Sequence, residues 1–243
     1  MKWCGVVAAA LVALIFTFSG VASTSPAPLH FYASQSGRQT LDQGEGGGNP
    51  FASALIEAMS QPNLTLGELP SELTRLTVSK SRGHQSPDVP SNAEPANWKF
   101  QPNLSFETRV ALIVVFSDYS ASGGAPSLPG AQHDASRVGT AFANVGFQTE
   151  TFVDPSLTEL DDILLKFSER SAVADFAIVY TTGHGVEVDG VVFLLPGDYP
   201  ISEQNRSLGE KAIRISRFAL ASRGRRANLI FYAGCRDNPF GAR

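Results

Sequence analysis

The 243-residue chain contains only two cysteines, Cys4 and Cys235, and no internal repeat. It also lacks an excess of basic residues, because 19 Lys and Arg stand against 23 Asp and Glu, for a net charge of -4. This balance predicts no broad basic face and no nucleic-acid partner. The one short basic run, Arg223 to Arg226, is more typical of a solvated helix end than of a phosphate site.

Long apolar runs are absent except near the N-terminus, where Lys2 precedes the run from Val6 to Phe18 and small residues follow it up to Ser23. This pattern predicts a signal peptide over residues 1–23, with export to the periplasm or the medium. The run is short for a membrane span, so membrane contact is expected only if the segment stays uncleaved. Cleavage removes Cys4, which leaves Cys235 as a lone thiol with no internal disulfide.

From Arg109 onward, apolar strands alternate with amphipathic helices. This alternation predicts an α/β fold with a mainly parallel sheet and helices on both faces. Asp189-Gly190 predicts a tight turn, and Asp134 is expected near the start of a helix. The expected strands are 110–116, 147–153, 176–181, 191–195 and 228–232, and the expected helices are 135–145, 156–171 and 212–222.

The first part of the chain does not show this regular alternation of strands and helices. Residues 24–30 are rich in Ser and Pro and are expected to be flexible. A short strand is predicted at 30–34, a polar loop at 37–48, and a helix opening at Asn49-Pro50, where Asn is a good N-cap. Thr65 and Glu68 have capping-box spacing for a second helix. A loop at 82–97 and a brief edge strand at 98–100 complete this part.

Two strand ends carry the residues best suited to chemistry, which are His184, flanked by glycines, and Cys235, which follows Gly234. Open α/β sheets place their chemistry where strands end, and a Cys and a His from neighbouring strands can form a thiolate–imidazolium pair. The backbone amides of Gly185 and Cys235 are natural oxyanion donors. Taken singly, His184 could be a surface histidine and Cys235 a small buried apolar residue.

Four segments carry a resemblance to a known family: "FAIVYTTGHGVEVDGVVFLLPGD", "ANLIFYAGCRDNPFG", "RVALIVVFSDY" and "LPGAQHDASRVGTAFANVGF". They resemble caspase-like cysteine peptidases, particularly bacterial metacaspase and orthocaspase relatives. The resemblance implies a caspase-like fold with a six-stranded sheet and a large-subunit-like part over residues 109–243. It also implies that His184 and Cys235 form the catalytic dyad. The caspase signature Gln-Ala-Cys is replaced by Ala233-Gly234-Cys235.

The family continues past its cysteine with a small-subunit part, and here the segment "FYASQSGRQTLDQGEGGGNPFASALIEAM" resembles that part although it comes first. We therefore expect a circular permutation, with residues 31–100 as the small-subunit-like part and 101–108 as a linker. Four strand spacings are roughly 19 Å and an extended bridge of this length reaches about 26 Å, so the connection is possible. The alternative is that residues 24–107 form an unrelated pro-segment.

The resemblance also bears on specificity. Related metacaspases have an acidic residue two positions before the cysteine, where this chain has Ala233, so a preference for Arg or Lys is in doubt. Asp42 resembles another acidic position of the substrate pocket, and it could equally be an ordinary loop aspartate. Arg38 could instead favour an acidic substrate residue, although it is poorly placed for that.

Together these features predict a cysteine endopeptidase that hydrolyses peptide bonds through a thioester, with a peptide or protein as its substrate and with no metal or other cofactor. One alternative is an inactive caspase-like module that binds protein partners. The other is an α/β protein of different function in which Cys235 is structural.

Overall fold

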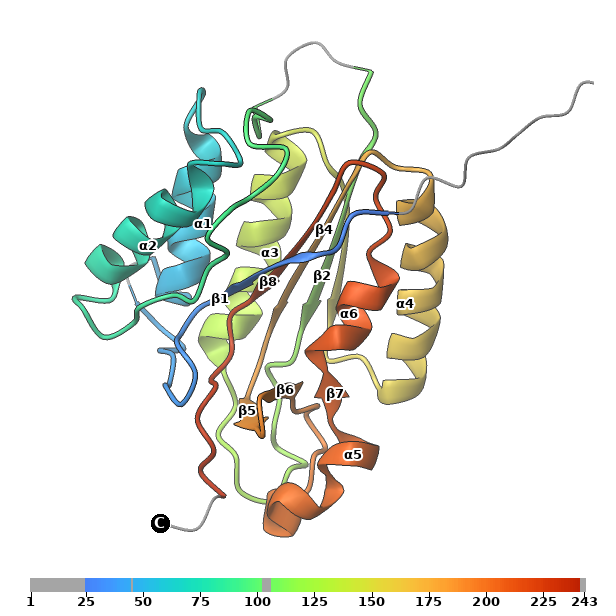
Figure 1. Cartoon of the computed structure of the whole chain (residues 1–243). Helices are drawn as coiled ribbons and strands as arrows, with labels where there is room; N and C mark the ends of the chain where they lie inside the picture. The colour runs from blue at the N-terminus through green and yellow to red at the C-terminus, as the bar shows by residue number, and fades with distance from the viewer. Residues whose placement is uncertain (1–24, 45, 102–105, 241–243) are drawn as a thin grey trace, which may run out of the picture.

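The central feature of the computed structural model, which describes residues 25–44, 46–101 and 106–240, is a five-stranded sheet (Figure 1). All its neighbouring strands are parallel. Across the sheet the order is β1 (Leu29–Tyr32), β8 (Ala227–Tyr232), β4 (Phe176–Thr182), β2 (Arg109–Val115) and β3 (Gln148–Val153). The three middle strands are buried along their whole length, as expected for parallel strands covered on both faces.

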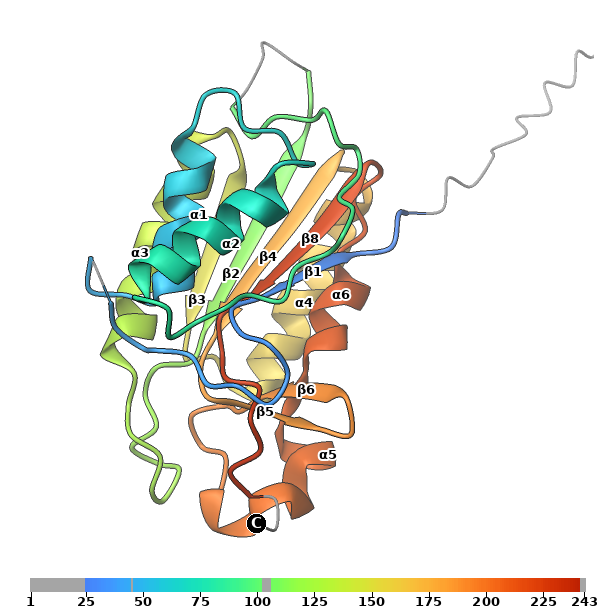
Figure 2. The same cartoon turned by 60° about the vertical axis from the view of Figure 1, so that its left-hand side comes forward.

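Helices cover both faces of this sheet (Figure 2). One face carries α1 (Pro50–Ser60), α2 (Leu69–Lys80) and α3 (Pro129–Asn144), and the other carries α4 (Leu157–Ala172) and α6 (Ile215–Ala221). Each layer encloses its own apolar core. The predicted caspase-like α/β fold, with a parallel sheet and helices on both faces, is confirmed.

A small antiparallel sheet lies at the carboxyl end of the large one (Figure 1). It contains β5 (Gly185–Val188), β6 (Val191–Leu194) and β7 (Ile213–Arg214), with η1 (Ile201–Ser207) and α5 (Leu208–Lys211) between β6 and β7. The Asp189-Gly190 turn joins β5 to β6 as predicted. The helix predicted from residue 212 is wrong at its start, because Ile213 and Arg214 pair with β6 before α6 begins.

The large sheet has five strands among the described residues, whereas six were predicted. Where a sixth strand would lie beside β1, Asp88 forms a single antiparallel bridge with Tyr32, through N–H···O bonds of 2.8 and 2.9 Å. Pro90 occupies the next hydrogen-bonded position on one side of that bridge and has no N–H to donate, so the ladder cannot continue in that direction. The edge strand predicted at 98–100 is reduced to a single antiparallel bridge between Lys99 and Thr65. The indole of Trp98 stacks on Phe176 at 4.1 Å between ring centroids.

Local helix signals are confirmed at two starts. The Asn49 side chain accepts from the Phe51 N–H at α1, and Ser156 forms a capping box with Glu159 at α4. The prediction for Asp134 is wrong, because α3 begins at Pro129 and Asp134 lies inside it, fully buried. The earlier start has a distant cause: the Asp42 carboxylate accepts from the first free amides of α3.

The N-terminal prediction, a signal peptide over residues 1–23, falls outside the described residues, and so does Cys4. In the segment predicted to be flexible, the Ser25 hydroxyl donates to the Gly224 carbonyl and Pro26 accepts from the Asn228 side chain. Over the described ranges, no helix combines the length and the apolar character needed to cross a bilayer.

Candidate active site

His184 and Cys235 leave neighbouring strands at the same level. In the β4–β8 ladder Thr181 is opposite Tyr232, and each candidate residue follows three positions later. The ladder is extended by the N–H of Ala233, which donates to the Thr181 carbonyl at 2.9 Å, and by the Thr182 hydroxyl, which donates to the Ala233 carbonyl at 3.2 Å. The two chain segments therefore start towards the carboxyl edge of the sheet side by side.

Two glycines let these segments approach closely. A Cβ on Gly185 would collide with the Tyr232 hydroxyl and lie 2.9 Å from the Cys235 carbonyl oxygen. A Cβ on Gly234 would lie 2.8 Å from the carbonyl oxygen of Gly183. Since real Cβ atoms do not approach so closely, only glycine permits this backbone contact. The glycines beside His184 and Cys235 are thus needed for the packing of these two segments.

The His184 ring is oriented by the segment that follows β2. Its Nε2 lies 2.8 Å from the Pro126 carbonyl oxygen, and its edge packs against the Tyr119 ring at 4.5 Å between centroids. The Tyr119 hydroxyl also accepts from the His184 backbone N–H at 2.8 Å. A carbonyl oxygen only accepts, so the neutral ring carries its proton on Nε2 and leaves Nδ1 as the basic nitrogen.

The Cys235 sulfur is half-buried and contacts Thr40, which lies 195 positions earlier in the chain. The Thr40 N–H donates to Sγ at 3.3 Å, and the Thr40 hydroxyl lies 3.5 Å from it. Burial raises the pKa of the Cys235 thiol, and the two contacts from Thr40 act in the opposite direction. In the described part of the chain no hydrogen bond joins this sulfur to the His184 ring.

The segment around Thr40 is fixed to the segment that carries the cysteine. The N–H of Gly37 donates to the Arg236 carbonyl at 3.1 Å, and the N–H of Arg236 donates to the Arg38 carbonyl at 2.9 Å. The Gln39 side chain donates to Asp237 at 2.8 Å. These contacts place a loop from the start of the chain over the candidate nucleophile. No local signal in the sequence distinguishes Thr40, because its contact is made entirely across the fold.

A cleft of about 440 Å³ opens beside Thr40. Its lining includes Arg38, His84 and Asp237, together with Gln39 and Thr40 itself. Cys235 and His184 are not among its lining residues, and its walls come from residues 37–41, His84 and Asp237. A peptide bound there would meet charged side chains of both signs.

Asp42, predicted to bind substrate, lies at the N-terminus of α3. Its two carboxylate oxygens accept from the backbone N–H groups of Gly130 and Ala131 at 3.0 and 2.9 Å. A carboxylate at this end of a helix is stabilised by the helix dipole, which explains why the side chain is held there. Its role in substrate binding stays a prediction, alongside this structural one.

Ala233, the other predicted pocket residue, is 2% exposed and belongs to the core between the sheet and α1. Its carbonyl accepts from the Asn49 side chain at 3.2 Å. The Asn49 N–H in turn donates to Asp134 at 2.8 Å, and Arg137 pairs with Asp134 at 2.9 Å. Burial raises the pKa of Asp134 to about 6. This buried carboxylate could not be recognised from the sequence, where Asp134 is expected near the start of a helix.

A comparison with models of protein families matches the caspase domain to residues 108–241, more than half of the chain. The chain belongs to the caspase-domain family. This is a family of peptidases, and the part of the caspase domain matched here contains both His184 and Cys235. A search of curated proteins found no match. The strand β1 and the helices α1 and α2 precede the matched residues, although they pack into the same fold.

Proposed function

We propose that this caspase-domain protein is a cysteine endopeptidase of the metacaspase type, with Cys235 as nucleophile and His184 as general acid and base. The observation that carries the proposal is that the two residues follow paired positions of β4 and β8 at the same distance along the chain. Nδ1 of His184 takes the thiol proton while the sulfur attacks the substrate carbonyl carbon. The backbone N–H groups of Gly185 and Cys235 stabilise the resulting oxyanion.

The cycle closes without any added group. The protonated His184 donates to the leaving amine as the peptide C–N bond breaks, which leaves a thioester on Cys235. Water, deprotonated by the same ring, then attacks the thioester carbonyl, and the thiol leaves with a proton. No metal or other cofactor enters these steps, and the substrate is a peptide or protein.

The test is trapping of the thiol by a panel of reactive peptides, in which each carries an electrophilic carbonyl group at its C-terminus. We expect labelling of Cys235 in the unaltered chain, its loss in Cys235→Ala and slowing in His184→Ala by about a hundredfold or more. Peptides ending in basic or acidic residues report specificity at the same time. If Asp42→Ala leaves labelling by basic peptides unchanged, Asp42 is not part of the pocket.

Two observations favour the alternative of an inactive module that binds protein partners. Burial raises the pKa of the Cys235 thiol, and the Thr40 N–H already donates a hydrogen bond to its sulfur. In that case reactive peptides label the thiol no faster than a simple alkylating reagent does. A dependence of the rate on peptide sequence, abolished in His184→Ala, supports the peptidase.

We also propose that the chain is a circular permutation of the family fold. In support, β1 lies parallel to β8 at the edge of the sheet although it is far away in sequence, and it precedes the residues that match the caspase domain. On this proposal residues 31–100 are the small-subunit-like part, 101–108 the linker and 109–243 the large-subunit-like part. The alternative assigns residues 24–107 to a separate pro-segment.

Export remains a proposal that rests on residues 1–23. The N-terminal sequence of the protein recovered from cells tests it, because cleavage after Ala22 or Ser23 is expected. Recovery of the intact N-terminus in a membrane fraction would instead indicate an uncleaved anchor.

A further inference from the structure

The two edge strands of the large sheet differ, because β1 has a backbone partner on its outer side and β3 has none among the described residues. Figure 2 shows β1 and β3 at opposite edges. The outer side of β1 carries the bridge to Asp88, with Pro87 and Pro90 on either side. Among the described residues, no strand or bridge covers the outer side of β3. An open strand edge is a template for pairing with another chain.

The free backbone groups of β3 can be identified. The N–H of Asp154 donates to the Val115 carbonyl of β2 at 2.8 Å. Because the direction of N–H groups alternates along a strand, the N–H and carbonyl groups of Thr149, Thr151 and Val153 point away from β2. β3 contains no Pro, Gly or Lys, the residues that commonly protect an edge from pairing.

Grooves of different chemistry flank this edge on the two faces of the sheet. On the α3 face a groove of about 510 Å³ has an entirely uncharged lining, which includes Gly139, Ala143 and Thr151. On the α4 face a groove of about 350 Å³ is lined by apolar residues and by four charged ones, Asp154, Glu159, Asp162 and Lys166. The carboxylates of Asp154 and Glu159 also accept hydrogen bonds from Ser117 and Ser156. We call this the acidic groove, because its carboxylates outnumber its ammonium group. Successive side chains of an added strand would enter the two grooves alternately.

We propose that β3 binds an extended segment of a partner protein by strand addition, and that this segment alternates small uncharged residues with Arg or Lys. The basic side chains lie in the acidic groove, and the small ones lie against α3. Antiparallel pairing with β3 of a second copy is disfavoured, because it would bring the acidic grooves of both copies onto the same face. The proposal does not depend on the chemistry of Cys235.

The ladder is tested with the labelled peptide Thr-Arg-Val-Arg-Thr-Arg-Val and the full chain carrying Cys235→Ala, so that the peptide stays intact. Binding is followed by fluorescence anisotropy. Thr151→Pro removes one outward N–H and is expected to weaken binding by about tenfold or more. Thr151→Val, which keeps the backbone groups, is the matched control and is expected to bind within about twofold of the parent.

The acidic groove is tested through Asp162, which makes no hydrogen bond or ion pair with any described residue. Asp162→Asn is expected to weaken binding about threefold to tenfold and to reduce its dependence on salt. The same peptide with Glu in place of Arg is expected to bind at least about tenfold less tightly.

A peptide methylated on the backbone nitrogens that would face β3 tests the ladder on a chain with unaltered β3, in case Thr151→Pro does not fold. Equal binding by methylated and plain peptides, or by Arg and Glu peptides, would overturn the proposal. So would a concentration-dependent dimer in sedimentation that Thr151→Pro abolishes, because the edge would then be occupied by a second copy.

Discussion

Arg236 follows the candidate nucleophile directly, and its guanidinium contacts three other segments. It pairs with Glu187 at 2.7 Å and Asp88 at 2.6 Å, and it donates to the Ser34 carbonyl at 3.2 Å. It also lies over the Tyr32 ring, 4.2 Å from the centroid. The side chains of Arg236 and Glu187 are both largely buried. The position of Cys235 therefore depends on a charged side chain enclosed by the fold.

Removing this charge leaves Glu187 buried without its partner. We expect Arg236→Met to lower the free energy of unfolding by about 3 kcal/mol, because an unpaired buried charge is costly. Arg236→Lys keeps the charge but loses the planar set of donors, so it should cost less. Denaturant unfolding at neutral pH measures both variants. Equal stability of Arg236→Met and the parent would contradict this account.

Asp134 predicts a dependence of stability on pH. Its pKa is raised from 3.8 to about 6 in the fold by burial, so folding favours its protonated form. The stability that this site contributes is present at low pH and is lost as the pH rises from about 4 to about 6. The advantage of the parent over Asp134→Asn should therefore shrink by roughly 2 to 3 kcal/mol between pH 4 and pH 7. Unfolding curves across that range measure it, and a constant or growing difference would be the opposite outcome.

At the scale of elements, α1 and α4 both begin with a side-chain N-cap, and the two helices lie on opposite faces of the sheet. Asn49 caps α1 and also donates to the Ala233 carbonyl, two residues before Cys235. Ser156 caps α4 through a capping box on the opposite face of the sheet. The two caps offer a matched comparison between a helix end at the site and one away from it.

Both Asn49→Ala and Ser156→Ala are expected to lower the free energy of unfolding by about 1 kcal/mol. Only Asn49→Ala should also change the rate at which an alkylating reagent modifies Cys235, because it removes a bond to the end of β8. Denaturant unfolding and thiol alkylation under native conditions separate the two effects. An altered alkylation rate in Ser156→Ala would show that general loosening is responsible.

The sequence predicts elements where their cause is local. The caps at Asn49 and Ser156 and the buried middle strands are confirmed because they rest on contacts between neighbours or on runs of apolar residues. Predictions fail where the cause is distant. α3 begins early because Asp42 accepts from its first turn, and Ile213 and Arg214 form a strand because β6 lies beside them.

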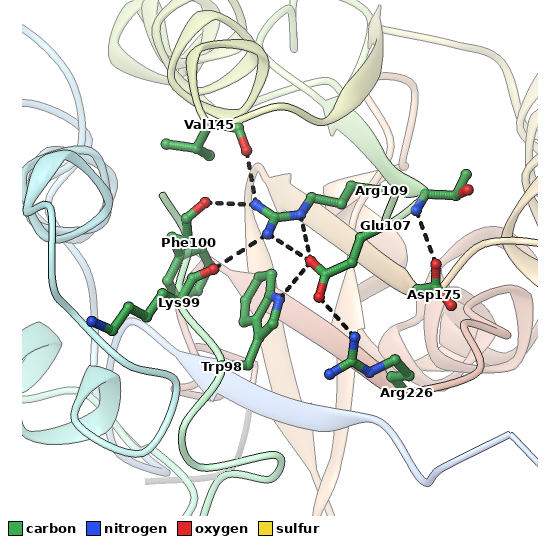
Figure 3. Close-up of polar contacts among 9 residues, drawn as sticks. Trp98, Lys99, Phe100, Glu107, Arg109, Val145, Asp175 and Arg226 are labelled. Atoms are coloured by element: carbon green, nitrogen blue, oxygen red, sulfur yellow. Dashed lines mark hydrogen bonds and ion pairs between the residues drawn. The ribbon is translucent and has the colours of Figure 1, made fainter. Parts of the chain in front are cut away.

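At the scale of the whole molecule, residues before and after position 105 are joined at the amino end of the sheet (Figure 3). Glu107 accepts from the Trp98 indole and from Arg109, and it pairs with Arg226 at 2.7 Å. Arg109 also donates to the Phe100 carbonyl at 2.6 Å and the Val145 carbonyl at 3.0 Å. The cluster fixes the segment that leads into residues 101–108 against β2.

Cleavage of the chain within 101–108, at an introduced protease site, should therefore leave two fragments that stay associated. The contacts of β1 with β8 and of α1 with α3 also join the two fragments, and cleavage does not remove them. Size-exclusion chromatography of the cleaved protein measures this. Separation into a folded core and an unfolded piece would show that the first part is a pro-segment. As a control, Trp98→Ala should weaken the association without preventing it.

The candidate site was accessible to sequence reasoning only in part. His184 and Cys235 stand out because each follows a strand and lies beside glycine, and the resemblance to caspase-like peptidases reinforced them. Thr40 could not be found, because its contact with the sulfur joins segments that only the fold brings together. That the first part of the chain belongs to the same fold was likewise expected only from that resemblance.

The place of β8 in the sheet has a consequence for synthesis on the ribosome. β8 lies between β1 and β4, yet it follows every other strand of the sheet in the chain. β1, translated first, has no strand to pair with until β8 has emerged, so the sheet cannot assemble progressively from its N-terminal end. A nascent chain that stalls before this point lacks both the strand that joins β1 to the rest of the sheet and the nucleophile. Incomplete translation products therefore cannot carry the proposed activity.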